Sequence, residues 1–387
     1  MNRQQLNEDF YQTVLGEYEQ NNSITITSIT KTAACEIGIS HVCLVSRVNV
    51  TGYKNDKVYK KSIIIKELPN PEQHHLYRSN LAMMNEMQAY RRIIPALQQH
   101  TTGHLPVANC IYAEEDLIML EDLSLDEFKP NKNKNVGFTL VQCEVVLKAL
   151  AKLHAASLVM EIKTPKLFEE LIKLTKEILY YESDSCLLNY QTSYLNNVIE
   201  IFRTDSDERI IRALHDLKEN SKLRLKKLLT TPRRHSVICH GDCWAGNVLF
   251  NSRNEVKLVD LQLMRYGSVA RDLTYLFYVN LLPKLRRKNM ERLLEEYLHV
   301  LKDNITMRGI MLDDILTKEW LDSEMKAFLE YGVVYGMWLM PLFFRRREDF
   351  EISRKSLDNS VRAIKQYDTD YKERLREIIL EYVENRF

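Results

Sequence analysis

Residues 238–261 read ICHGDCWAGNVLFNSRNEVKLVDL, and this stretch combines a polar motif with two short apolar runs. The runs NVLF and VKLVD, joined by NSRNE, predict a β-hairpin. Pairing within a hairpin brings the end of its second strand beside the start of its first. We therefore expect Asp260 to lie close to Asn247 and Asp242.

Two aspartates and an asparagine that converge in this way suit phosphoryl transfer. That reaction needs one carboxylate to orient a hydroxyl and accept its proton, and oxygen ligands to hold Mg²⁺ on the phosphates of ATP. The interval from Asp242 to Asn247 equals the Asp-to-Asn interval of the kinase catalytic loop. The structural alternative is an Asx-rich turn beside a buried hairpin. A zinc site built from His240, Cys239 and Cys243 is disfavoured because no second spaced pair accompanies it.

A kinase also needs a lysine on a strand of its sheet and a glutamate on the following helix to hold that lysine. Lys66 ends the apolar run SIIIK, and Glu86 lies in the helical pattern that follows. The alternatives are a strand-end lysine that reaches solvent and a solvated helix face. Because each residue supports the other, we interpret them as a pair.

The composition is that of a folded chain without a dominant charge. The 387 residues are 45% hydrophobic, and 54 Lys and Arg nearly balance 53 Asp and Glu, so charge indicates neither nucleic acid nor an anionic membrane. No signal peptide or membrane span is predicted; the apolar segment at 331–344 fits a buried helix. The seven scattered cysteines favour free thiols in the cytoplasm.

The order of predicted elements indicates an α+β fold with two lobes. Apolar and β-branched runs predict strands at 23–30, 41–50 and 60–68, with the segment 51–57 as a turn, and two more strands precede residue 123. A helical pattern covers 72–99, and 129–135 reads as a polar loop. Beyond it, nearly everything except 236–261 is helical. We predict a small β-rich lobe at 1–120 and a large helical lobe at 121–387, together a bilobal protein kinase-like fold.

The sequence resembles the ecdysteroid kinase-like family, which is related to choline kinases and aminoglycoside phosphotransferases. The resemblance rests on NEMQAYRRIIPAL, LIMLEDLS, LAKLHAAS, HGDCWAGNVLF and VKLVDLQLMRYGSVARDLTYLF. It implies that Asp242 is the catalytic base, that Asn247 and Asp260 ligate Mg²⁺, and that Lys66 and Glu86 serve the nucleotide phosphates. It further implies an adenine-binding hinge at Glu121, Asp122 and Leu123, a phosphate turn containing Gly38, and supporting roles for His240 and Asp272. The turn around Gly38 carries fewer glycines than is usual in the family.

These features predict an ATP- and Mg²⁺-dependent kinase that acts on a hydroxyl of a small, apolar acceptor. By resemblance this is an ecdysteroid, another steroid alcohol or a hydroxylated xenobiotic. Only eleven residues separate Asp260 from Asp272, which leaves no room for a peptide-docking activation loop. The alternatives are a pseudokinase or lipophile-binding protein with the same fold, and a choline or aminosugar kinase. Aromatic residues could line the acceptor pocket or simply form core: Phe168, Tyr180, Tyr181, Tyr190, Tyr194, Trp338, Phe343 and Phe344.

Overall fold

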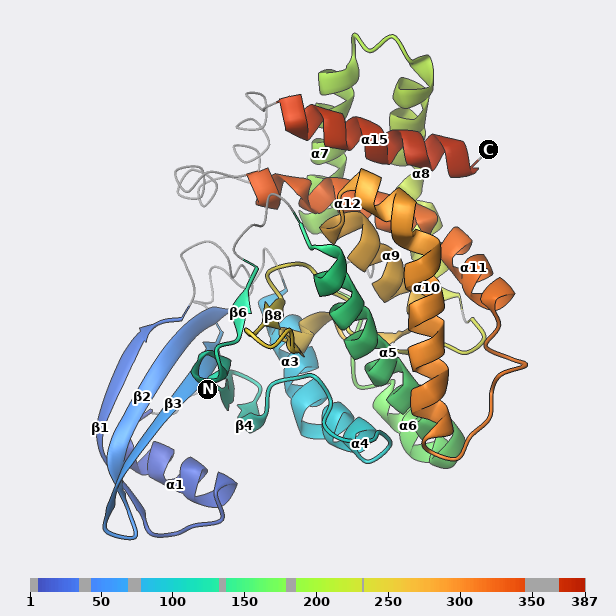
Figure 1. Cartoon of the computed structure of the whole chain (residues 1–387). Coiled ribbons are helices and arrows are strands. Elements are labelled where there is room, and N and C mark those ends of the chain that lie inside the picture. Colours follow the sequence, from blue (N-terminus) through green and yellow to red (C-terminus); the bar gives the residue numbers. More distant parts are fainter. Residues whose placement is uncertain are drawn as a thin grey trace.

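The computed structural model describes residues 6–34, 43–68, 78–131, 137–178, 186–231, 233–344 and 369–386. It confirms an α+β fold with an antiparallel N-terminal sheet and a helical C-terminal part (Figure 1). The boundary between residues 120 and 121 stays a prediction and falls at the end of the last strand of the sheet. Gly38 lies outside the described residues.

The N-terminal sheet has five strands in the order β1-β2-β3-β5-β4. They are β1 (Ile24–Ala33), β2 (Leu44–Lys54), β3 (Lys57–Glu67), β4 (Cys110–Glu114) and β5 (Leu117–Glu121). The predicted turn at 51–57 is too long, because residues 51–54 continue β2. The reversal needs only Asn55 and Asp56, whose φ angles of 49° and 60° give the two-residue turn that matches strand twist.

The sheet is covered by α1 (Glu8–Tyr18), which packs its apolar side against the strands (Figure 1). Asn7 caps this helix through its side chain, which accepts from the backbone N–H of Phe10 at 3.0 Å. Tyr11 and Leu15 then join Val48, Ile63 and other buried strand residues in a separate core. The strand order places β3 in the middle of the sheet, bonded to a neighbour on each side. Lys66, near the end of β3, is therefore held on a rigid element.

The helix that carries Glu86 is α3 (Ser79–Gln88), which continues through a π-helical turn, η2 (Ala89–Ile93), into α4 (Ile94–Gln98). Pro95 lies near the start of α4. Proline lacks an N–H and crowds the carbonyl four residues earlier, and a wider turn relieves that crowding. The predicted helical pattern at 72–99 is thus confirmed from Ser79 onward; residues 69–77 lie outside the described part of the chain.

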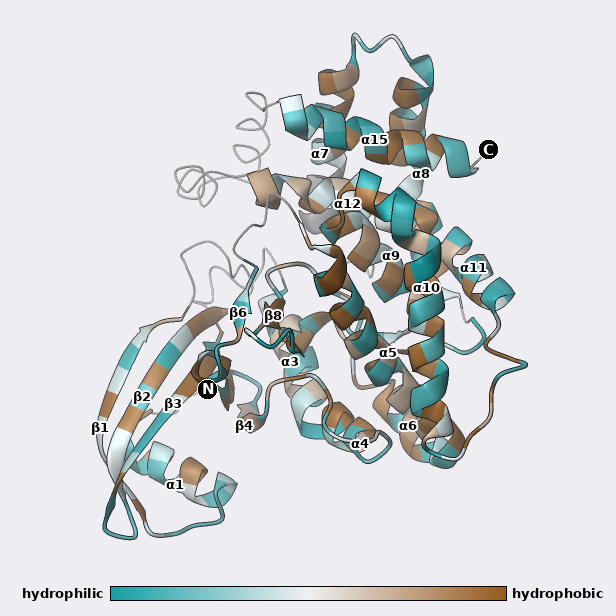
Figure 2. Ribbon diagram, viewed as in Figure 1, coloured by the Kyte–Doolittle hydropathy of each residue, from teal (hydrophilic) through white to brown (hydrophobic). Residues whose placement is uncertain are grey.

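The C-terminal part is built mainly of helices around one continuous core. Their bounds are α5 (Leu140–Lys163), α6 (Pro165–Leu171), α7 (Cys186–Phe202), α8 (Glu208–Thr230), α9 (Val269–Asn280), α10 (Pro283–Thr306), α11 (Lys318–Ala327), α12 (Leu329–Phe344) and α15 (Thr369–Arg386). A capping box of Thr139 and Gln142 starts α5. Every residue of α9 is buried, and its ribbon and that of α12 are coloured mainly as hydrophobic (Figure 2).

Short strands form an island between the sheet and the helices. They are β7 (Val237–Cys239), β8 (Val248–Phe250), β9 (Val256–Leu258) and β10 (Arg265–Gly267), with the 3₁₀ turn η5 (Leu261–Leu263) between the last two. The predicted hairpin is confirmed: β8 pairs with β9, with Val248 opposite Leu258. The segment 129–135 was predicted as a loop, but Lys129–Pro130 form a short strand, β6, against β8.

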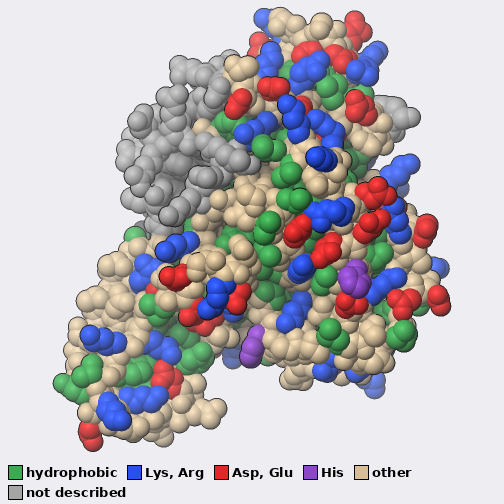
Figure 3. All heavy atoms as spheres, viewed as in Figure 1, with side chains coloured by type: hydrophobic (Ala, Val, Ile, Leu, Met, Phe, Trp, Pro, Cys, Tyr) green, Lys and Arg blue, Asp and Glu red, His purple; other side chains and the backbone are tan. Residues whose placement is uncertain are grey.

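The visible surface carries basic and acidic side chains side by side, without a broad patch of one sign (Figure 3). This matches the formal net charge of +1. The apolar segment at 331–344 lies in α12 and most of its side chains are buried, as predicted. In the part of the chain that the structure describes, no helix combines the length and apolar character needed to cross a membrane.

Candidate active site

Lys66, Glu86 and Asp260 meet where the sheet faces the strand island. Lys66 Nζ donates to Glu86 Oε2 at 2.5 Å and to Asp260 Oδ1 at 2.6 Å. Lys66 and Glu86 are 6% and 1% exposed. Although burial opposes its charge, Asp260 and Glu86 hold the pKa of Lys66 well above its usual value. The two predicted nucleotide residues are therefore brought together with one predicted metal ligand.

The backbone around Asp260 is turned to present its carboxylate. Asp260 adopts a left-handed conformation with φ 68° and ψ 66°, between β9 and η5. The backbone N–H of Leu261 donates to Glu86 Oε1 at 3.2 Å, and Gln262 Nε2 donates to Asp260 Oδ2 at 3.1 Å. The strand end is thus fastened to α3 through the second oxygen of Glu86.

Asp242 lies on the loop between β7 and β8, and both of its carboxylate oxygens accept hydrogen bonds. Asn247 Nδ2 donates to Asp242 Oδ2 at 2.8 Å, and the hydroxyl of Tyr275, on α9, donates to Oδ1. The hairpin brings Val259 beside Asn247, whose carbonyl accepts from the Val259 N–H at 3.0 Å. The spacing argument therefore placed Asp242, Asn247 and Asp260 around one point.

The carboxyl group of Asp242 has an unusual proton affinity. Burial raises its pKa to about 7, and the nearby negative charge of Asp260 adds to this, while the bonds from Tyr275 and Asn247 act in the opposite direction. Its side chain stays partly accessible. A partly accessible carboxyl that exchanges a proton near neutral pH can act as a general base.

Asp272, at the start of α9, holds the loop that carries Asp242. It accepts from the backbone N–H groups of His240 at 2.7 Å and Gly241 at 2.8 Å. His154, on α5, contacts the same carboxylate through Nε2 at 3.1 Å. Gly241 has φ 85°, and a Cβ there would lie 2.2 Å from the carbonyl oxygen of Leu263, so only glycine fits this turn.

His240 is a structural member of the same loop. Its Nε2 donates to the carbonyl of Val259 at 3.1 Å, and its Nδ1 accepts from the backbone N–H of Asp242 at 3.2 Å. Burial lowers the pKa of His240. Because both ring nitrogens are bonded to the backbone, the ring orients the loop, and neither nitrogen is free to exchange a proton with a substrate.

The predicted hinge residues lie at the end of β5 and directly after it. Glu121 ends that strand and pairs with Asn109 through backbone and side chain, at 3.0 and 2.9 Å. The carboxylate of Asp122 is engaged by Arg47 and Ser62 of the sheet and caps the 3₁₀ turn η3 (Leu123–Asp126). The carboxylates of Glu121 and Asp122 are thus engaged within the protein, and adenine binding by the backbone of residues 121–123 stays a prediction.

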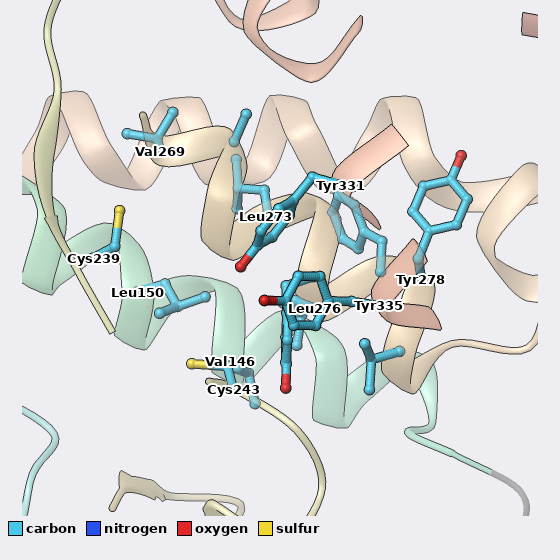
Figure 4. Packing of buried hydrophobic residues seen from close by; sticks show 14 of the residues in the cluster. Val146, Leu150, Cys239, Cys243, Val269, Leu273, Leu276, Tyr278, Tyr331 and Tyr335 are labelled. Atoms are coloured by element: carbon cyan, nitrogen blue, oxygen red, sulfur yellow. The ribbon is translucent and has the colours of Figure 1, made fainter. Parts of the chain in front are cut away.

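Cys239 and Cys243 lie in different apolar environments of the core, beside α5 and α9 (Figure 4). The thiol of Cys239 contacts backbone carbonyls, including that of Ser268 at 3.3 Å. Burial raises the pKa of both thiols well above the usual value. Both thiols therefore stay protonated, as is usual for cysteines packed in a core.

One contact to the loop was missed by the sequence interpretation. Tyr275 lies three residues after Asp272, in a run that reads as apolar helix, and no spacing rule directs its hydroxyl to Asp242. Among the aromatic residues considered for the acceptor pocket, Phe168 and Tyr194 are buried in the core, 2% and 1% exposed. Tyr180 and Tyr181 lie outside the described residues.

An antiparallel sheet, a helical lobe and a loop of aspartate and asparagine between them define the class of kinase-like phosphotransferases. The model of the Ecdysteroid kinase-like family matches residues 40–310. The chain belongs to this family. Among curated proteins none matches significantly.

Several solved structures are similar along nearly the whole chain at low identity. A spectinomycin phosphotransferase in complex with ADP and spectinomycin is 14% identical, with 99% of this chain and 100% of that chain covered and a TM-score of 0.44. A choline kinase from Cryptosporidium parvum is 10% identical, with 98% and 94% covered and a TM-score of 0.44. A macrolide 2'-phosphotransferase from Brachybacterium faecium is 11% identical, with 92% and 97% covered and a TM-score of 0.39.

Proposed function

We propose that this protein is an ATP- and Mg²⁺-dependent kinase that phosphorylates a hydroxyl group of a small, mainly apolar molecule. One observation carries the proposal: charged and polar side chains from three separate segments of the chain lie close together. Lys66 of β3 bonds to Asp260, which follows β9, and Asn247 bonds to Asp242 within the loop between β7 and β8. Glu86 of α3 completes the arrangement behind Lys66.

Asp242 orients the acceptor hydroxyl and takes its proton as the oxygen attacks. Its two hydrogen bonds, from Tyr275 and Asn247, fix the plane of the carboxylate before the acceptor arrives. Holding a reactant in one orientation removes much of the entropic barrier to transfer. A base whose pKa lies near neutrality still accepts a proton readily at pH 7.

The residues present fit Mg²⁺. Asn247 turns its amide nitrogen toward Asp242, so its amide oxygen faces away, and Asp260 supplies a carboxylate. Such hard oxygen donors are what Mg²⁺ prefers. When bound, Mg²⁺ would neutralise charge on the ATP phosphates. Lys66 contacts the phosphates, held in one rotamer by Glu86, and backbone groups of residues 121–123 bind adenine. The proposal also keeps the turn that contains Gly38 as a contact to the phosphates.

A small acceptor is supported by the chain that follows Asp260. Its eleven residues to Asp272 form η5, β10 and the start of α9, and β10 pairs with β7, with Arg265 opposite Cys239. A segment fixed in this way offers no long loop for a peptide. Family membership favours a steroid alcohol such as an ecdysteroid, or a hydroxylated xenobiotic. Cys110, Cys143, Cys239 and Cys243 form no disulfide, which suits a reducing compartment such as the cytoplasm.

Two measurements test the proposal. Mg-ATP should raise the melting temperature, because a ligand that binds the native state stabilises it; no shift at millimolar nucleotide rules out a kinase and favours a binding protein that keeps the fold. Labelled phosphate should then pass from ATP to members of a panel of steroid alcohols, phenolics, choline-like amines and aminosugars. Asp242→Asn should lower kcat by about 10²- to 10⁴-fold, and transfer that survives it contradicts the assignment of the base.

A further inference from the structure

Two arginines lie buried beside the proposed active site, and the proposed mechanism uses neither of them. Arg265 of β10 is 6% exposed and Arg271 of α9 is 2% exposed. Buried arginines normally have acceptors for their N–H groups, because an unpaired buried charge is costly. The contacts of these two guanidinium groups therefore show whether their N–H groups all have acceptors.

They share a single carboxylate. Arg265 Nη1 lies 2.5 Å from Glu177 Oε2, and Arg271 Nη2 lies 3.9 Å from the same oxygen, too far for a hydrogen bond. Arg265 also donates to the carbonyls of Leu263 at 3.1 Å and Lys176 at 3.4 Å. Three N–H positions, Nη2 of Arg265 and Nε and Nη2 of Arg271, have no hydrogen-bond acceptor in the described part of the chain.

Asp272, the next residue in the chain, is occupied by other partners. Asp272 follows Arg271 directly, but its two carboxylate oxygens already accept from the backbone of His240 and Gly241, with His154 beside them. Two guanidinium groups thus lie beside one carboxylate. Burial and the neighbouring charge of Arg271 lower the pKa of Arg265, as expected where like charges share a site, whereas for Arg271 the effect of burial is outweighed by Tyr331 and Glu177, which raise its pKa.

This cluster adjoins the base through α9 and α12. Arg271 and Tyr275 are four residues apart on α9, so they lie on one side of that helix about 6 Å apart along its axis. The guanidinium of Arg271 lies over the ring of Tyr331 at 5.7 Å. The ring of Tyr335 lies 4.5 Å from that of Tyr331 and 5.3 Å from that of Tyr275. Figure 4 shows Tyr331 and Tyr335 together beside α9.

We infer that Arg265 and Arg271 form a binding site for an oxyanion, a carboxylate, sulfate or phosphate group, one helical turn from the hydroxyl-transfer site. The unpaired N–H groups form a fork that planar or tetrahedral oxyanions match. Glu177, whose side chain is 20% exposed, marks the side from which the cluster is approached. The anion is either an acidic group on the acceptor itself, which rests on the proposed function, or free phosphate.

The first experiment measures anion binding directly. Phosphate and sulfate are titrated at constant ionic strength, and the melting temperature is followed, with saturating Mg-ADP to fill the nucleotide site. Should Mg-ADP itself give no shift, the proposed function fails, and the titration is repeated in a Lys66→Met background. Saturable stabilisation by these anions and not by chloride is expected; its absence overturns the inference.

Matched variants locate the site. Arg271→Met should raise the Kd of the anion at least tenfold. Arg271→Lys keeps the charge but loses the paired N–H groups of the guanidinium, and it should raise the Kd less. Glu177→Gln removes the competing carboxylate and should tighten anion binding, an effect opposite to that of a merely structural loss. Arg253→Met changes net charge equally at a side chain that is 71% exposed and should change nothing. Equal anion affinity in wild type and Arg271→Met overturns the inference.

A second experiment separates the two sources. A hydroxylated steroid acid is compared with its methyl ester as acceptors. If the acidic group belongs to the acceptor, wild type favours the acid at least tenfold in kcat/KM, mainly through KM, and Arg271→Met abolishes this preference. Arg271-dependent binding of phosphate without that preference assigns the site to free phosphate. Equal preference for the acid in both proteins removes the site from acceptor recognition.

Discussion

Lys66 donates to Asp260 at 2.6 Å although 194 positions separate the two residues. This bond joins the central strand of the N-terminal sheet to the strand island of the helical part. Glu86 lies on the other side of the same ammonium group. The proposed nucleotide site is thus also a point at which the two parts of the molecule are fastened together.

Lys66→Met should therefore lower both stability and nucleotide binding. It leaves the carboxyl groups of Glu86 and Asp260 without their cation, and breaking such a buried pair costs about 3–5 kcal/mol. The denaturant midpoint should fall and the stabilisation by Mg-ATP should disappear. Lys31→Met is the control: Lys31 pairs with Glu67 in the same sheet but is 45% exposed, so its loss should cost less than about 1 kcal/mol. Equal losses in the two variants would contradict the prediction.

Asp122 should make the sheet sensitive to acid. Burial would raise its pKa, but the bonds from Arg47, Ser62 and Ser124 outweigh that effect and hold it at about 2. A carboxyl whose folded pKa lies below its ordinary value stabilises the fold above about pH 4, and this contribution, about 2 kcal/mol, is lost as pH falls toward 2. Urea unfolding at several pH values should give Asp122→Asn a lower free energy of unfolding than wild type near pH 6. This difference should shrink as the pH falls toward 2. A difference that stays constant with pH would refute this account.

Gly241→Ala should damage the loop far more than Gly309→Ala. Both glycines have positive φ, 85° and 75°, so alanine costs about 1–2 kcal/mol of backbone strain at each. At Gly241 the new Cβ also meets the backbone carbonyl of Leu263, whereas nothing lies within 4 Å at Gly309. The melting temperature and the rate of phosphate transfer should both fall further in Gly241→Ala than in Gly309→Ala. Similar behaviour of the two variants would show that Leu263 can move away.

A zinc chelator should leave the unfolding transition unchanged. His154, Cys239 and Asp272 place possible ligand atoms within 4.8 Å of one another. His154 is already bonded to Tyr297 and Asp272, and the thiol of Cys239 contacts the carbonyl of Ser268. A group whose members satisfy each other needs no metal. A fall in melting temperature with the chelator, reversed by added zinc, would show the opposite.

Local spacing was enough to predict the part of the site that a single hairpin builds. Asp242, Asn247 and Asp260 lie within nineteen residues of one another in the printed chain, and β-pairing leaves little freedom over that length. Lys66 and Glu86 were predicted from their order along the chain, because a strand followed by a helix places both at one edge of the sheet.

Contacts between distant helices could not be predicted in this way. Tyr275 reaches Asp242, and Arg271 reaches Tyr331, only because α9 is buried on every side and packs against α12. The sequence there reads as ordinary core. The direction of a side chain on a fully buried helix depends on its partners, and these are set by tertiary packing rather than by local pattern.

The left-handed backbone of Asp260 limits which residues can replace it. Outside glycine, asparagine and aspartate are the residues that adopt this conformation most readily. A substitution by asparagine would thus keep the turn between β9 and η5 while removing the negative charge beside Lys66. At this one position, the proposed metal ligand would lose its charge while the backbone of the turn kept its conformation.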